Sequence, residues 1–239
     1  MRNYLGLLHI LWSPKNRACQ FFEFENRSFE KSGEIENGGG VSQVCLIIIK
    51  PPNMEFPTED ILFRAFKENP DGAGIAFNLN NNIYIHKGYM TYKHFIEAYN
   101  EIVTSIAYLK GSTVVFHFRR ASRGGVHPDL THPFPISSDM DTLTQHFCKT
   151  EYAVFHNGTI KLMDKAIKKN RKLSDTLLFV RDYISPLATN KNWFENDSNI
   201  ELLGRLADSK LCILSPTGQF KLTGQFFEQN NLIFSQNLR

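Results

Sequence analysis

Short apolar runs recur along the chain from residue 44 onward. Runs of this kind, rich in β-branched and aromatic residues and ending at Gly, Pro or polar residues, are typical of buried β-strands. They predict strands at 44–49, 113–118 and 152–156. Two further pairs of runs flank turn-forming residues and predict β-hairpins at 74–86 and 211–222.

Other segments carry apolar residues three or four positions apart, which is the spacing of one face of an α-helix. The pattern predicts helices over 58–69, 91–109, 174–184 and 200–207. Thr58 and Ser174 have side chains that cap helix N-termini. Strands and helices come in blocks and do not alternate strictly, so the pattern favours a layered α+β fold with antiparallel sheets.

Residues 1–43 follow a different pattern. After Trp12 they show no sustained period of two or 3.6 residues, and they end in Gly38-Gly39-Gly40, which predicts a flexible break. Their charges balance, so the formal net charge of +3 belongs to the rest of the chain. We therefore predict two parts, a leader over 1–44 and a folded domain over 45–239.

Composition narrows the class of protein. Of the 239 residues 42% are hydrophobic, which is enough for a packed core, and a charge of +3 without basic runs argues against nucleic-acid binding. The longest apolar stretch, Tyr4 to Trp12, is far shorter than the roughly 20 residues of a membrane span. The four cysteines are widely and irregularly spaced, as expected of buried thiols in a cytoplasmic protein.

Cys45, the second residue of the first predicted core strand, is the first candidate for chemistry. A lone cysteine at such a place is usually a small core residue. Arg119 begins a polar, glycine-rich loop at the end of another core strand, and an arginine there can bind a carboxylate with two parallel hydrogen bonds. The alternative for this loop is a solvated basic segment.

Two further segments add polar groups. Asn157 and Gly158 follow a buried strand, where a side-chain amide and a backbone N–H can both point at an oxyanion. The alternative is an ordinary hairpin turn. Asp175 stands at a helix start, where it can receive an ammonium group or act as a cap.

In this order the segments resemble the class II glutamine amidotransferase domain, most closely the small stand-alone members found in bacteriophages. The resemblance covers about residues 44–223 and rests on a strand that starts with Cys, followed by Asn-Pro-Asp-Gly-Ala-Gly (69–74), His-Phe-Arg-Arg-Ala-Ser-Arg-Gly-Gly (117–125), His-Pro-Phe (132–134), His-Asn-Gly (156–158) and Ser-Asp-Thr (174–176). It implies the N-terminal nucleophile (Ntn) hydrolase fold, a four-layer αββα sandwich of two antiparallel sheets.

The resemblance also implies roles for individual residues. Cys45 is the nucleophile that attacks the side-chain amide of glutamine, and Asn157 with the Gly158 N–H forms the oxyanion hole. Arg119 binds the substrate α-carboxylate and Asp175 its α-ammonium group. Two more residues match positions that line the glutamine pocket, Ser122 and His132. Arg123 departs from the pattern, since better-known members carry His there.

The chemistry requires a base, because a free Cys with a pKa of about 8.5 is mostly protonated at neutral pH. His117 and His156 lie within apolar strands and are more often satisfied core histidines. In the family that the chain resembles, the base is the α-amino group of the nucleophile residue itself, whose ordinary pKa is about 7.7–8.0. Ammonia then leaves, and water hydrolyses the γ-glutamyl thioester.

This mechanism requires Cys45 to be the first residue, which leaves three explanations for residues 1–44. In the first, residues 1–44 are a propeptide that is cleaved off between Val44 and Cys45. In the second, translation truly starts at Val44, read as initiator Met and then removed, so that the upstream start is misassigned. In the third, the domain keeps the fold but has lost the activity. The prediction for the first two is a native protein that begins at Cys45.

The expected function is therefore glutamine hydrolysis that supplies ammonia to a separate synthetase. The alternatives are an Ntn amidohydrolase acting on another amide, such as a γ-glutamyl or peptide bond, and a catalytically silent binding module. We expect no cofactor and no metal, since the His127–His132 loop segment lacks the helical spacing of a metal-binding pair.

Overall fold

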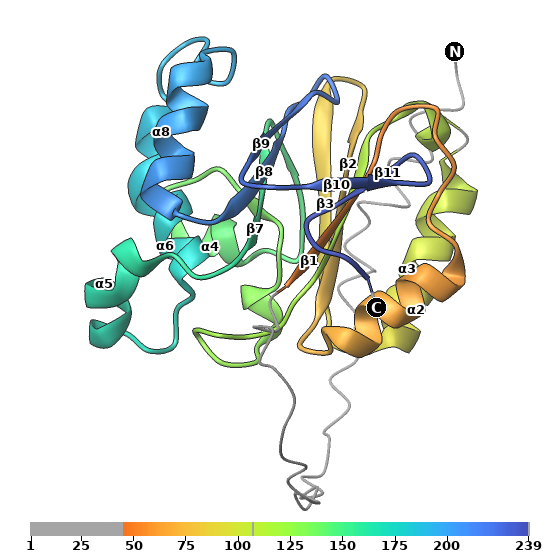
Figure 1. Cartoon of the computed structure of the whole chain (residues 1–239), viewed down its shortest axis with the longest axis horizontal. Coiled ribbons are helices and arrows are strands. Elements are labelled where there is room, and N and C mark those ends of the chain that lie inside the picture. Colours follow the sequence, from red (N-terminus) through yellow and green to blue (C-terminus); the bar gives the residue numbers. More distant parts are fainter. Residues whose placement is uncertain (1–44, 107, 239) are drawn as a thin grey trace, which may run out of the picture. The chain divides into compact units, whose positions relative to one another are not determined.

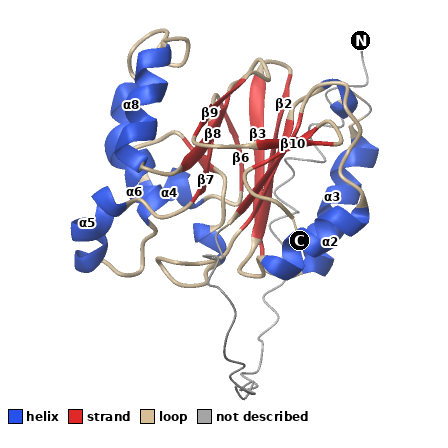
Figure 2. Ribbon diagram, viewed as in Figure 1, coloured by secondary structure: helices blue, strands red, loops and turns tan. Residues whose placement is uncertain are grey.

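The computed structural model describes residues 45–106 and 108–238, all of which lie within one compact unit, Gln43–Arg239. The leader predicted over 1–44 lies outside the described residues. The described part contains two antiparallel sheets, one of seven strands and one of four, together with helices (Figures 1 and 2). The predictions of an α+β fold and of antiparallel sheets are confirmed.

The larger sheet has the strand order β10-β11-β1-β4-β2-β3-β6. Its strands are β1 (Leu46–Lys50), β2 (Ala73–Leu79), β3 (Asn82–Tyr89), β4 (Val114–Phe118), β6 (Phe147–Thr150), β10 (Phe227–Gln229) and β11 (Leu232–Phe234). The two predicted core strands, β1 and β4, are neighbours near its centre and are buried along their whole lengths. The predicted hairpin of β2 and β3 turns at Asn80 and Asn81, both with positive φ, as tight hairpin turns require.

The smaller sheet has the order β5-β7-β8-β9. Its strands are β5 (Phe134–Pro135), β7 (Ala153–Asn157), β8 (Lys210–Leu214) and β9 (Phe220–Thr223). The predicted strand at 152–156 is β7, and the predicted hairpin at 211–222 is β8 and β9. Alternate residues of the two sheets meet in one apolar cluster, in which Ile47 and Val115 from the larger sheet join Phe155 and Cys212 from the smaller sheet.

Helices cover the outer faces of both sheets (Figure 1). On the larger sheet, aromatic residues of α2 (Glu59–Glu68) and α3 (Tyr92–Ser105) pack against Phe116 and Phe118. A second apolar cluster joins the outer face of the smaller sheet to the remaining helical segment. That segment contains α4 (Met140–Thr144), α5 (Asp164–Lys169), α6 (Asp175–Phe179), α7 (Ser185–Leu187) and α8 (Asp197–Ala207).

The predicted helix bounds need three adjustments. The helix predicted over 91–109 ends at Ser105, and Leu109 belongs to a separate 3-10 turn. The helix predicted over 174–184 is α6 followed by a π-helical turn, Val180–Ile184. The last helix starts at Asp197, three residues before the predicted Ile200, because the Asn196 side chain caps it.

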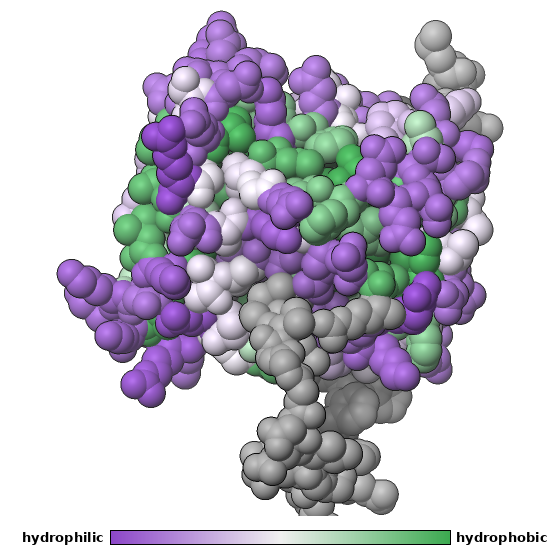
Figure 3. All heavy atoms as spheres, viewed as in Figure 1, coloured by the Kyte–Doolittle hydropathy of each residue, from purple (hydrophilic) through white to green (hydrophobic). Residues whose placement is uncertain are grey.

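Polar and apolar residues are intermixed on the face seen in Figure 3, with no single kind covering it. None of the helices in the described part of the chain has the length and apolar composition that crossing a bilayer requires.

Candidate active site

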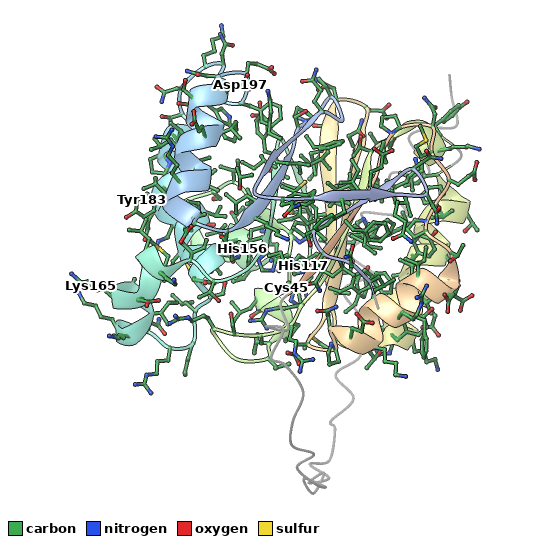
Figure 4. All side chains as sticks on the ribbon, in the orientation of Figure 1. Cys45, His117, His156, Lys165, Tyr183 and Asp197 are labelled. Carbon is green, nitrogen blue, oxygen red and sulfur yellow. The ribbon has the colours of Figure 1, made fainter. Side chains whose placement is uncertain are left out.

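Cys45 lies immediately before β1, opposite the end of β4. The antiparallel register pairs Leu46 with Phe118, so the next step along both strands places Cys45 across from Arg119. Because side chains alternate along a strand, Cys45 lies on the same side of the sheet as Ile47, between the two sheets. Figure 4 shows Cys45 close to His117, a residue of the neighbouring strand β4.

The Cys45 thiol is enclosed, with only 7% of the residue exposed. Its Sγ accepts a hydrogen bond from the Arg120 N–H at 3.3 Å and donates one to the Arg120 carbonyl oxygen at 3.4 Å. Burial raises the pKa of the thiol to about 11, although the Arg120 N–H and the Arg119 guanidinium favour the thiolate. With residue 44 attached, the thiol is therefore protonated at neutral pH and needs a base.

Arg119 is a buried cation beside this thiol. Its guanidinium donates to the carbonyl oxygens of Gly125 at 2.7 Å and Arg123 at 2.8 Å, which uses two of its five N–H groups. Burial lowers its pKa, while negative charge on Cys45, Asp71 and Asp175 acts in the opposite direction. The solvated basic loop that was the alternative for this segment does not fit a residue that is 3% exposed.

The 69–74 motif holds the backbone on which Arg119 sits. The Arg119 N–H donates to the Gly72 carbonyl at 2.7 Å, and the Asp71 N–H donates to the Arg119 carbonyl at 3.0 Å. The Asp71 carboxylate accepts from the Ala121 N–H at 2.8 Å. A Cβ at Gly74 would lie 2.1 Å from the His132 carbonyl oxygen, so glycine is required where these two segments meet. The motif therefore positions the arginine loop.

Asp175 is the first residue of α6, but it is not the helix cap. Ser174 is the N-cap, and its Oγ accepts from the Leu177 N–H at 3.1 Å. The Asp175 carboxylate accepts from the N–H groups of Ile160 at 2.7 Å and Thr176 at 2.8 Å, with 4% of the residue exposed. Its negative charge also acts on the pKa of both Cys45 and Arg119, raising each of them.

Asn157 is the last residue of β7, and Gly158 follows it. β7 pairs with β5 and β8 and not with a strand directly after Gly158, so the alternative of a hairpin turn here is wrong. Gly158 has a φ of +142°, and a Cβ there would lie 2.8 Å from Cβ of Ser209. The side-chain amide of Asn157 donates from Nδ2 to Ser235 Oγ at 2.8 Å, a contact that the sequence did not indicate.

The two residues expected to line a glutamine pocket differ in exposure. Ser122 is exposed, and its Oγ accepts from Thr159 Oγ1 at 3.4 Å, close to the Asn157–Gly158 segment. His132 is 3% exposed and stacks on His117 with ring centroids 4.2 Å apart. Neither ring nitrogen of His132 has a hydrogen-bond partner among the described residues, and burial holds its pKa well below the ordinary value.

His117 and His156 are both buried, but only His156 is a fully satisfied core histidine, because Nδ1 of His117 has no hydrogen-bond partner among the described residues. His156 bonds Thr176 Oγ1 at 2.7 Å and Ser209 Oγ at 2.9 Å. His117 donates from Nε2 to the His156 carbonyl oxygen at 2.9 Å. Burial lowers the pKa of His117 to about 3 and that of His156 to about 4, so both rings are neutral at neutral pH.

Sequence reasoning missed Ser235, because it stopped at Thr223 and left the last segment without a role. The available signal was the apolar run Leu232-Ile233-Phe234 directly after the turn-forming pair Asn230-Asn231, a pattern typical of the second strand of a hairpin. In the structure these residues form β11, which pairs with β1 and brings Ser235 to Asn157.

Within residues 45–106 and 108–238, no cluster of His, Cys, Asp and Glu side chains has an arrangement suited to a metal ion, and that includes the segment from His127 to His132. No protein-family model matches the chain. A search of curated proteins likewise finds no match.

Proposed function

We propose that the protein hydrolyses the side-chain amide of glutamine, with Cys45 as the nucleophile. One observation carries the proposal: the sheet register places the buried Arg119 across from Cys45, and the buried Asp175 carboxylate influences both groups. A free α-amino acid presents a carboxylate and an ammonium group on one carbon. A buried guanidinium and a buried carboxylate match that pair, because each charge needs a partner once it leaves water.

The order of layers supports the same proposal. The layers follow one another in this order: helices α2 and α3, the seven-stranded sheet, the four-stranded sheet and the second helical segment. This order is consistent with the four-layer αββα sandwich that the proposal implies. In that fold the nucleophile begins a central strand, which is the place of Cys45 before β1.

The proposed base is the α-amino group of Cys45, set free when residues 1–44 are absent. A peptide nitrogen cannot accept the thiol proton, because its lone pair is delocalised into the carbonyl. An α-amine has an ordinary pKa of about 7.7–8.0 and is partly unprotonated at neutral pH. It belongs to the same residue as the thiol, so its position relative to Sγ is set by the residue itself.

The proposed reaction has two halves. In the first, Sγ attacks the amide carbon, the carbonyl oxygen becomes an oxyanion, and the protonated α-amine passes its proton to the departing nitrogen, which leaves as ammonia. In the second, water attacks the thioester, glutamate leaves and the thiol is restored. In both halves the developing oxyanion would be stabilised by Asn157 and the Gly158 N–H.

The ammonia would pass to a separate synthetase, the partner class that the resemblance implies. Other amides, such as γ-glutamyl or peptide bonds, are alternative substrates for the same nucleophile. A panel of glutamine, asparagine and γ-glutamyl amides separates these classes, because Arg119 and Asp175 favour substrates that carry a free α-carboxylate and α-ammonium group. A silent binding module would bind such compounds and turn over none of them.

The test uses the full chain with residues 41–44 replaced by the recognition sequence of a protease that cleaves directly before Cys45. Cleavage after folding yields a protein that begins at Cys45, confirmed by intact mass, and ammonia release from glutamine is then measured. We expect activity in the cleaved protein and none in the uncleaved chain or in cleaved Cys45→Ala. Cys212→Ala, which removes another buried thiol from β8, is the matched control and should retain activity. Cleaved protein that is folded yet releases no ammonia from glutamine would refute the proposal.

A further inference from the structure

Ser235 links three strands at the candidate site. It follows β11 and is fully buried. Its N–H donates to the Ile47 carbonyl at 3.0 Å, and its Oγ accepts from the Ile47 N–H at 2.9 Å. Lys210 at the start of β8 donates from Nζ to the Ser235 carbonyl oxygen. Since Ile47 lies two residues after Cys45 on β1, Ser235 joins the strand of the nucleophile to the strand of Asn157.

In the arrangement around Ser235 Oγ, the Ser235 hydroxyl proton and the Asn157 Oδ1 both lack a hydrogen-bond partner within the described part of the chain. Both contacts to Oγ bring a donor, one from the Ile47 N–H and one from Asn157 Nδ2. The hydroxyl proton is then left without an acceptor among the described residues. At the other end of the same amide, Asn157 Oδ1 is buried and has no donor from any described residue. A buried polar atom without a partner costs about 1–3 kcal/mol.

A half-turn of the Asn157 amide about its last side-chain bond gives both the Ser235 hydroxyl proton and the Asn157 Oδ1 a partner. Ser235 Oγ still accepts from Ile47 N–H, and its proton is now donated to Oδ1 of Asn157. Nδ2 moves to the place that Oδ1 occupied. Its two N–H groups then take a buried place to which no described residue donates a hydrogen bond, and an oxyanion that arrived there would be met by donors.

We propose that Ser235 is a positioning residue, whose hydroxyl donates to Oδ1 of Asn157 and so keeps Nδ2 directed at the oxyanion formed during amide hydrolysis. The inference rests on the proposed function and deepens it. Ser235 touches neither the substrate nor the thiol, and it acts through Asn157. The developing oxyanion is the acceptor that we propose for the amide N–H groups.

A purely structural Ser235 would also close the contact between β1 and β11, so stability alone cannot decide. Kinetics of the cleaved protein separate the two roles, because a positioning residue affects the chemical step, and hence kcat, more than it affects substrate binding. Ser235→Ala is expected to lower kcat about 10-fold with KM changed less than about 2-fold. Ser235→Thr keeps the hydroxyl and should restore kcat. Ser215→Ala removes another buried serine, beyond the far end of β8, and should leave kcat unchanged.

Coupling to Asn157 gives the sharpest readout. In an Asn157→Ala background, Ser235→Ala should change kcat by less than about 2-fold, because the group that Ser235 orients is gone. Equal losses of kcat with and without Asn157, or full activity in Ser235→Ala, would overturn the inference while leaving glutamine hydrolysis in place.

Neutron diffraction decides the inference even if the cleaved protein fails to hydrolyse glutamine. A deuteron on Ser235 Oγ directed at Oδ1 of Asn157 supports it. A deuteron on Nδ2 lying between the two side chains overturns it. Failure of the proposed function and failure of the Ser235 inference therefore give different results.

Discussion

Cys45 and Arg119 lie opposite each other at the ends of β1 and β4, one step beyond the paired residues Leu46 and Phe118. The sheet register thus brings a thiol and a buried guanidinium together from positions 74 residues apart in the sequence. The guanidinium favours the thiolate, and Asp175 opposes it.

Altering either charged residue that we propose binds the substrate should weaken catalysis by the cleaved protein. Arg119→Lys keeps the charge but loses the planar fork, and Asp175→Asn removes the negative charge. Each should lower kcat/KM for glutamine about 10- to 100-fold, since a hydrogen bond to a charged group contributes about 1.5–3 kcal/mol. Arg181→Lys, in a partly exposed ion pair with Asp182, is the control. A kcat/KM unchanged in both site variants would mean that the two charges do not bind the substrate.

The reactivity of Cys45 should depend on whether residues 1–44 are attached. In the uncleaved chain the buried thiol, with a pKa of about 11, should react slowly with iodoacetamide, and its rate should rise without a plateau from pH 7 to pH 10. Cleavage frees the α-amine, so labelling at pH 7.5 should become faster. Peptide mass spectrometry measures the modification at Cys45. Equal rates before and after cleavage would contradict the proposed role of the amine.

Gly158 should tolerate no side chain. Its φ of +142° is unfavourable for L-residues, and a Cβ there would lie 2.8 Å from Cβ of Ser209. Gly158→Ala should lower the free energy of unfolding by about 1–3 kcal/mol and reduce activity, measured by urea denaturation and ammonia release. Gly111→Ala is the matched control, since the nearest atom to a Cβ there is Asn53 Oδ1 at 3.8 Å. An unaffected Gly158→Ala would show that this segment can shift.

The buried histidines should make the protein sensitive to acid. Burial lowers the pKa of His156 to about 4, so the unfolded chain binds a proton there that the folded protein does not. The stabilisation is fully present above about pH 6.5 and is lost as the pH falls toward the folded pKa, by about 1.4 kcal/mol per pH unit for each such histidine.

Urea unfolding at pH 7.0 and pH 5.5 measures this effect. His156→Gln should reduce the loss of stability between the two pH values, and His94→Gln, which alters an exposed residue of α3, serves as the control. A loss in His156→Gln as large as in the unmodified protein would show that His156 does not contribute.

Local patterns in the sequence were enough for much of the fold. Nearly continuous apolar runs, as in β1 and β4, identify strands that are buried on both faces, even though His117 lies within β4. Side-chain caps such as Thr58 and Ser174 act within three residues of their own position, so they are readable without a structure. Because such signals are local, two short strands were not predicted: β10, which is only weakly apolar, and β5, which has two residues.

For the candidate site, too, local sequence gives the residue types, and only tertiary structure gives their arrangement in space. The residue types at Cys45, Arg119, Asn157 and Asp175, and the order in which they occur, are properties of the sequence alone. Their convergence depends on strand pairing between distant segments, which no local pattern encodes. Ser235 shows this most clearly, since only the pairing of β11 with β1 brings a serine near the chain end to Asn157, 78 residues away.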